Sequence, residues 1–172
     1  ARRVLDRGLE VLLERAGAEK EFAADYATTL NNLAGLYRLA GRYDEAISLF
    51  DKAQHIYDAL PDVPPDVRAS CRNNAGLVLL DTGDGDGARR LFNRALAILP
   101  RDDRFDGVRA TTLVNLCCAC RLADDRKCLL ATAADLKSIL KKQAEPDELL
   151  CRFCDAILQE DTEDASGQRQ PA

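Results

Sequence analysis

The sequence has no methionine, no tryptophan and only 5% aromatic residues among its 172 positions. Sheets favour aromatic and β-branched side chains, so this scarcity indicates closely packed helices. No run of about 18 apolar residues is present, which argues against a membrane-spanning helix, and residues 1–16 are too charged for a secretion signal. Because residue 1 is not methionine, we expect the chain to be an excised or processed piece.

Histidine is also nearly absent, since His55 is the only one. No serine or cysteine motif accompanies it, and it falls in the middle of an expected helix. We therefore expect a solvated side chain and not a catalytic base. No glycine-rich phosphate loop follows a strand, because the sequence contains no convincing strand. The sequence predicts a protein that is not an enzyme and that uses no cofactor.

The seven cysteines are an odd number without an extracellular context, so we expect reduced thiols and a cytoplasmic location. Cys117 with Cys120, and Cys151 with Cys154, have the spacing of zinc half-sites. The same spacing suits the buried face of a helix, where a thiol acts as a small apolar group. We favour packing, with a metal site or a disulfide as the alternative. Residues 81–87 resemble a calcium loop but lack its glutamate, so we expect a turn there and predict no metal.

Charge is spread unevenly along the chain. The composition, 47% hydrophobic and 31% charged with a net charge of −5, is that of a globular protein. The body is nearly neutral, whereas residues 145–164 hold eight acidic residues against Arg152 alone. Because nucleic-acid binding needs a basic surface, this distribution argues against it.

A pattern with a period of about 42 residues runs through the sequence. Two adjacent asparagines, Asn31 and Asn32, return as Asn73 and Asn74. Further matches at the same shift are Gly41 with Gly83, Ala46 with Ala88, Phe50 with Phe92, and Ala53 with Ala95. A third copy follows at a shift of 41 with Asn115, although its second half diverges, and residues 4–16 match the second half of a unit.

Each unit predicts two helices. Residues 26–40 carry leucines and a tyrosine at a helical period, and Gly41 ends the segment as a left-handed cap. The second helix starts near Asp44 and is expected to bury one apolar stripe: Ala46, Ile47, Phe50, Ala53 and Ile56. Prolines separate the units. A helix pair cannot bury its stripe alone, so we predict an all-α fold, a solenoid of stacked antiparallel helix pairs.

These residues resemble the tetratricopeptide repeat family. The family pattern is matched by Leu30, Leu33, Ala34, Tyr37, Gly41, Tyr43, Ala46, Phe50 and Ala53. The 42-residue period and the paired asparagines resemble the longer repeats of kinesin light chain. The resemblance implies a right-handed superhelix and a protein-interaction role. We expect a partial repeat at 1–20, repeats at about 24–61, 66–100 and 107–143, a capping helix at 144–160, and a disordered polar tail at 161–172.

The asparagines are the main candidates for function. Stacking would place Asn32, Asn74 and Asn115 in one row along a groove, with Asn31 and Asn73 in a second row. An amide both donates and accepts, so it can pair with a peptide backbone, which is the role that the resemblance implies. The alternative is that these amides bond between helices and hold the stack together. Helix interiors disfavour asparagine by about 0.7 kcal/mol relative to alanine, so either role has to offset that cost.

Other residues of the first helices would shape the groove. Gly35 lies one turn after the asparagines, where a missing side chain would admit a ligand backbone, although tight helix packing would also explain it. Arginines on these helices would favour acidic ligand side chains. The predicted groove set is Asn31, Asn32, Gly35, Arg38, Asn73, Asn74, Asn115 and Arg121, with Arg72 and Arg109 as further arginines.

We therefore predict a module that binds a peptide or helix of a partner protein, with acidic residues in that partner favoured, and no nucleic acid or membrane. Two alternatives remain open. The repeats could pack against another part of a larger protein in a structural or regulatory role, or the cysteines could form a metal-binding domain.

Overall fold

The computed structural model describes residues 20–143 and 145–165. Within these residues the chain forms seven α-helices and one 3-10 helix, and no strand. Their bounds are α2 (Lys20–Leu39), α3 (Tyr43–Ala59), α4 (Pro65–Asp81), α5 (Gly85–Ile98), η1 (Asp103–Phe105), α6 (Asp106–Leu122), α7 (Arg126–Leu140) and α8 (Glu148–Ala165).

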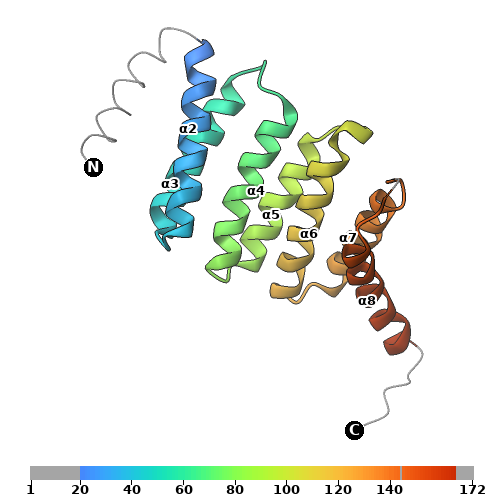
Figure 1. The fold of residues 1–172 in the computed structure, drawn as a ribbon. Helices are drawn as coiled ribbons and strands as arrows, with labels where there is room; N and C mark the ends of the chain where they lie inside the picture. Colours follow the sequence, from blue (N-terminus) through green and yellow to red (C-terminus); the bar gives the residue numbers. More distant parts are fainter. Residues whose placement is uncertain (1–19, 144, 166–172) are drawn as a thin grey trace.

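The helices form three antiparallel pairs that stack side by side (Figure 1). The pairs are α2 with α3, α4 with α5, and α6 with α7. The first helices of neighbouring pairs also touch, α2 with α4 and α4 with α6, and α8 packs on α7 at the end of the stack. The predicted solenoid of stacked helix pairs is confirmed.

The turn inside each pair needs a residue with positive φ. Gly41 has a φ of +70° in the first turn and Gly83 a φ of +83° in the second. Glycine adopts this left-handed conformation at little cost. In the third turn the equivalent residue is Asp124, with a φ of +52°. Aspartate tolerates this region better than most residues, which allows the third turn to keep the same shape.

Equivalent positions build the core of the first two pairs. Phe50 and Phe92 are fully buried, as are the small residues that flank them in α3 and α5: Ala46, Ala53, Ala88 and Ala95. A side-chain carbon added to Gly76 would lie 2.5 Å from the ring of Phe92. Glycine at this position therefore makes room for the ring.

Two expected core positions in α3 differ from the structure. The helix buries Leu49 and Tyr57, whereas Ile47 and Ile56 are only half-buried. The buried residues follow the spacing i, i+3, i+4, i+7 and i+11 from Ala46, which is a single stripe of a regular helix. The prediction included the two isoleucines on hydrophobicity alone, although they lie beside that stripe.

Some helix bounds also differ from the expected ones. The first helix begins at Lys20 and not at residue 26, and α8 continues to Ala165, beyond the expected end at 160. Extending a helix costs much less than starting one, so polar residues can continue it past the packed part. The expected partial repeat, apart from Lys20, and the rest of the expected tail lie outside the described residues.

Candidate functional site

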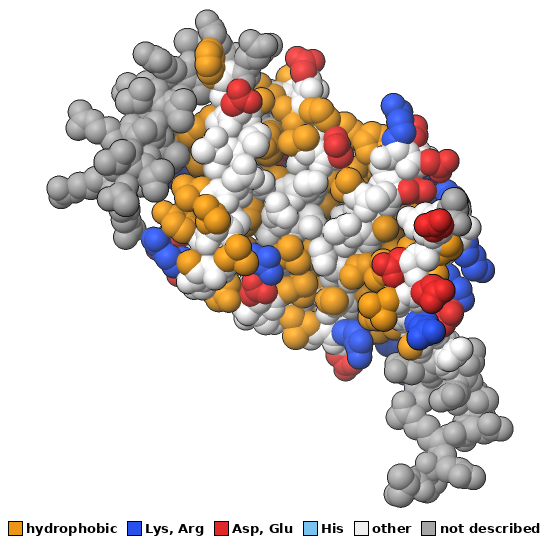
Figure 2. All heavy atoms as spheres, in the orientation of Figure 1, with side chains coloured by type: hydrophobic (Ala, Val, Ile, Leu, Met, Phe, Trp, Pro, Cys, Tyr) orange, Lys and Arg blue, Asp and Glu red, His pale blue; other side chains and the backbone are white. Residues whose placement is uncertain are grey.

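A shallow hollow of about 410 Å³ lies at the C-terminal half of α2. We call it the α2 hollow, and its lining residues are Asn31, Asn32, Gly35, Leu36, Arg38, Leu39, Phe50 and Asn74. Five of the eight predicted groove residues thus come together around one space. Asn73, Asn115 and Arg121 do not line it. Figure 2 views one face of the molecule, where apolar and uncharged side chains fill the middle and charged ones lie mainly at the edges.

The asparagines link neighbouring helix pairs. The Asn74 amide donates to Oδ1 of Asn31 at 3.2 Å, and the Asn115 amide donates to Oδ1 of Asn73 at 3.0 Å. The asparagine at the position of Asn74 thus bonds to the asparagine at the position of Asn31 in the preceding pair, twice in succession. The inter-helix role considered as the alternative is therefore present for these four side chains. A hydrogen bond contributes about 1 kcal/mol, enough to offset the helix cost of one asparagine.

Asn32 lies at the open edge of the stack. Its equivalents, Asn74 and Asn115, face the preceding pair, but no described helix precedes α2. Asn32 is exposed, and its Oδ1 accepts only a long 3.4 Å bond from Asn31. Leu36 is 63% exposed, whereas its equivalent in α4, Val78, is fully buried. In α4 and α6 the equivalent face packs against the preceding helix pair, whereas in α2 this outer face is exposed.

Gly35 leaves the backbone of α2 uncovered in this hollow. A side-chain carbon added there would meet nothing within 4 Å. Tight helix packing, which explains Gly76, therefore does not explain Gly35. The position costs about 1 kcal/mol relative to alanine without any contact in the described structure that requires it. The open space is what close approach of a ligand backbone would need.

The arginines on these helices are mostly held by internal partners. Arg38 makes two bonds to the Asp81 carboxylate, at 2.6 and 3.3 Å, which tie α2 to α4. Arg72 makes two bonds to Asp58, at 2.8 and 2.7 Å. Arg109 donates to a backbone carbonyl, and Arg121 lines a different, smaller hollow beside α7 and α8. An acidic ligand at the α2 hollow would have to compete with Asp81 for Arg38.

Two leucines of the hollow were not recognised from the sequence as functional candidates. Leu36 is one of the leucines whose helical spacing predicts the first helix, but it and Leu39 are 63% and 80% exposed. Exposed apolar side chains gathered at one place often mark an interaction surface. A signal was present, because the position of Leu39 holds Asp81 in the next unit, and a core position would not accept a carboxylate.

Comparison with known proteins identifies the family to which the first two repeats are similar. Residues 25–101 match the family model described as tetratricopeptide repeat. Residues 25–101 carry tetratricopeptide repeats. The kinesin-light-chain-like subclass expected from the sequence fits the 42-residue spacing of the repeats. Such repeats are generally protein-interaction modules and are typically non-enzymatic scaffolds.

A solved structure shares the fold. The crystal structure of BtubC (BKLC) from P. vanneervenii matches with a TM-score of 0.63 and 23% sequence identity. The match covers 81% of this chain and 57% of that chain, so the present chain spans little more than half the length of its structural relative. No curated protein matches the sequence. None of the described helices is long and apolar enough to cross a membrane.

Three of the six cysteines in α6, α7 and α8 are buried: Cys117, Cys120 and Cys154. Burial raises the pKa of Cys117 to about 12 and also raises that of Cys154, so both thiols stay protonated at neutral pH. Cys120 and Cys128 form a pair across the α6–α7 turn that the prediction did not anticipate. Their Cα atoms are 6.0 Å apart, a separation at which a disulfide can form. Among the described residues, no group of three or more ligating side chains could hold a metal ion.

Proposed function

We propose that this chain is a protein-interaction module that binds a peptide or helix of a partner protein at the α2 hollow. One observation carries the proposal. The uncovered backbone at Gly35 lies beside two exposed leucines and several amides, although no contact within the described structure needs that arrangement. General binding by tetratricopeptide repeats supports the same conclusion.

Each group has a distinct role in the proposed complex. Leu36 and Leu39 would anchor an apolar side chain of the partner, since burying apolar area is the main source of affinity. Asn74 gives one amide hydrogen to Asn31 and keeps its carbonyl oxygen, so it can accept from a ligand N–H group. Asn32 can both donate and accept. Because the helix stack fixes these groups in advance, binding loses little conformational entropy.

The partner is proposed to be a protein, with neither nucleic acid nor a membrane involved, in the cytoplasm. Acidic residues in the partner would have to share Arg38 with the Asp81 carboxylate, which lies 2.6 Å from its Nε. We therefore expect apolar contacts and backbone hydrogen bonds to contribute more affinity than charge.

The test is substitution at Gly35, because the folded structure tolerates it. A photo-crosslinking residue at position 39 identifies the partner segment, and calorimetry then measures its affinity. Gly35→Ala is expected to stabilise the fold by up to about 1 kcal/mol and yet to weaken binding, since the methyl group blocks the backbone. Gly107→Ala is the matched control, because its position is also open but lies outside the hollow. Equal affinity of Gly35→Ala and the parent chain would refute binding at the α2 hollow.

The outer face of α2 supports a second candidate, a structural role within a longer protein. Leu36 is exposed where Val78 and Ala119 are fully buried by the neighbouring repeat. Another part of a longer chain could cover this face. Hydrogen exchange of α2 in the longer protein separates the two roles. Protection there without any added partner supports the structural role, and exchange as fast as in the isolated repeats supports the open hollow.

A further inference from the structure

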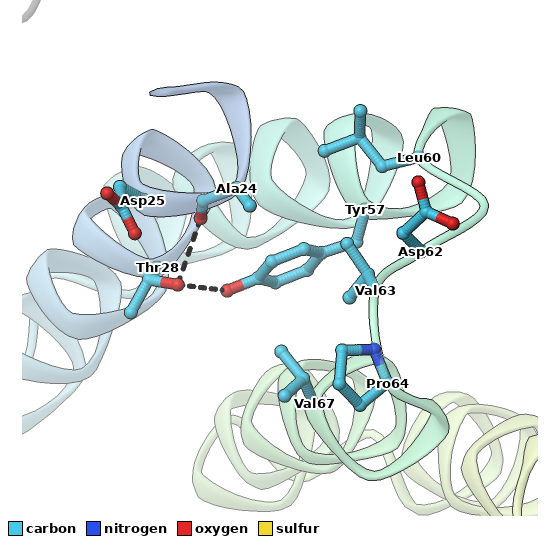
Figure 3. A pocket seen from close by; sticks show the side chains of 9 residues that line it. All are labelled: Ala24, Asp25, Thr28, Tyr57, Leu60, Asp62, Val63, Pro64 and Val67. Carbon is cyan, nitrogen blue, oxygen red and sulfur yellow. Dashed lines mark hydrogen bonds between the residues drawn. The ribbon is translucent and has the colours of Figure 1, made fainter. Parts of the chain in front are cut away.

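A second and larger pocket lies at the other end of α2. Its volume is about 560 Å³, and it is lined by the start of α2, the end of α3, the loop after α3 and the first turn of α4 (Figure 3). We call it the α3–α4 pocket. Its lining residues are Ala24, Asp25, Thr28, Tyr57, Leu60, Asp62, Val63, Pro64 and Val67. Most of the lining is apolar, which suits a large apolar side chain.

The loop wall of this pocket is held in place by one arginine. Arg68 donates to three successive parts of the loop, the carbonyls of Val63 at 3.0 Å, Leu60 at 3.2 Å and Pro61 at 2.9 Å. Arg72 then bonds to the carbonyl of Arg68, which fixes the two arginines relative to one another. The pocket is therefore preformed, and a ligand would not have to order the loop.

The hydroxyl groups in the pocket can only accept further hydrogen bonds. Thr28 Oγ1 donates its single hydrogen to the carbonyl of Ala24 at 3.0 Å. The 2.9 Å contact between Thr28 Oγ1 and the Tyr57 hydroxyl must then use the hydrogen of Tyr57 (Figure 3). Burial raises the pKa of Tyr57, so this phenol keeps its proton at neutral pH. Both hydroxyl oxygens can therefore accept a further hydrogen bond from a donor on the ligand.

The charged groups at the pocket, like its hydroxyl groups, can accept hydrogen bonds but not donate them. Asp25 and Asp62 are both exposed, and neither carboxylate pairs with a cation among the described residues. Asp58 and Asp81, in contrast, are neutralised by Arg72 and Arg38. The nearby Arg68 is committed to the loop carbonyls. Apolar walls that carry two unpaired carboxylates and two acceptor hydroxyls favour a cationic donor.

We propose that the α3–α4 pocket binds a basic, apolar peptide segment of a partner protein: one large apolar side chain that enters the pocket, with lysine or arginine beside it. The flanking cations would lie against Asp25 and Asp62. This site is separate from the α2 hollow, and its charge preference is the opposite of the acidic partner expected from the sequence. A single partner could occupy both ends of α2, but each site can be tested alone.

The test uses capped five-residue peptides and the full 172-residue chain in solution. The probe has the sequence Gly-Lys-Leu-Lys-Gly, with Gly-Glu-Leu-Glu-Gly and Gly-Lys-Ala-Lys-Gly as matched peptides. In an NMR titration we expect saturable shifts of the Thr28, Val63 and Val67 amides with the first peptide, at a Kd on the order of 1 mM. Exchanging lysine for glutamate or leucine for alanine should weaken binding at least about fivefold each.

Protein variants complete the experiment. The double variant Asp25→Asn, Asp62→Asn should raise the Kd about fivefold, and Thr28→Lys should abolish binding, because its ammonium group would occupy the cation position. Asp135→Asn, which removes one exposed carboxylate on α7 outside the pocket, is the control and should change nothing. The proposal is overturned if the glutamate peptide binds equally well, if shifts map elsewhere or do not saturate, or if the double variant binds unchanged. Gly35→Ala should leave this titration unaffected, so failure here and failure at the α2 hollow can be told apart.

Discussion

The second and third repeats fill the same core position with opposite choices of size. In the second repeat, Gly76 of α4 leaves space for the ring of Phe92 in α5. In the third repeat the equivalent residues are Cys117 and Ala133, which are both fully buried. The larger residue is thus on the first helix and the smaller one on the second. Relative to the second repeat, the third therefore gains volume on its first helix and loses volume on its second.

The different residues of the third repeat lie where that repeat meets α8, at the end of the stack. Cys117 and Ala133 share a buried cluster with Ile157 of α8, which packs against the third pair. A repeat followed by another pair receives that pair on its exposed side, whereas the third repeat receives a single helix of different shape. The third repeat therefore diverges where it must fit α8, and it keeps its resemblance where it faces the second repeat. The Asn115–Asn73 bond lies on that unchanged side.

The largest expected effect comes from breaking the size match in the second repeat. Phe92→Ala should destabilise the fold by about 3–5 kcal/mol through the cavity it leaves. Gly76→Cys should cost about 1–3 kcal/mol, because its side chain would collide with the ring. The double variant has the cysteine and alanine pair of the third repeat. Its free energy of unfolding should fall by at least about 0.5 kcal/mol less than the two single losses added together. Chemical denaturation measures all three, and strict additivity would contradict the size exchange.

The two asparagine bonds should differ in strength, and this gives an intermediate effect. Asn115→Ala leaves the Oδ1 of Asn73, a side chain only 8% exposed, without its partner, which should cost about 1–3 kcal/mol. Asn74→Ala leaves the half-buried Asn31, which water can reach, so the lost bond costs little. Alanine regains about 0.7 kcal/mol of helix propensity in both variants, so burial alone separates them. We expect a net change near zero for Asn74→Ala. Equal losses from the two variants, measured by thermal unfolding, would show that burial does not govern these bonds.

The smallest effect is expected at the third turn. Asp124 has a φ of +52°, a region that favours glycine. Asp124→Gly should stabilise the protein by about 1 kcal/mol, while Gly83→Asp should destabilise it by a similar amount at the equivalent turn. A rise in Tm for the first variant and a fall for the second check this point. Two changes of the same sign would mean that side-chain contacts at these turns outweigh backbone conformation.

The repeat pattern predicted the fold well, because small, aromatic and glycine residues recur at fixed spacing. The pattern assigned Gly41, Gly83, Phe50 and Phe92 to their roles correctly. The candidate site was harder to predict. The asparagines were singled out, but one sequence cannot tell whether an amide bonds to a ligand or to the next helix. The answer depends on which groups the stack brings within hydrogen-bond distance.

The sequence alone determined the helix pairs, their turns and their number in the repeating part. These follow from local rules, since apolar spacing, proline and glycine act within a few residues of the chain. Only the tertiary structure decided that Leu36 and Leu39 are exposed, that Arg38 is held by Asp81, and that a preformed pocket lies at the start of α2. The exposure of the leucines depends on which helices pack beside α2. The ion pair and the pocket join residues about 40 positions apart, and only the stacking of the helix pairs brings such residues together.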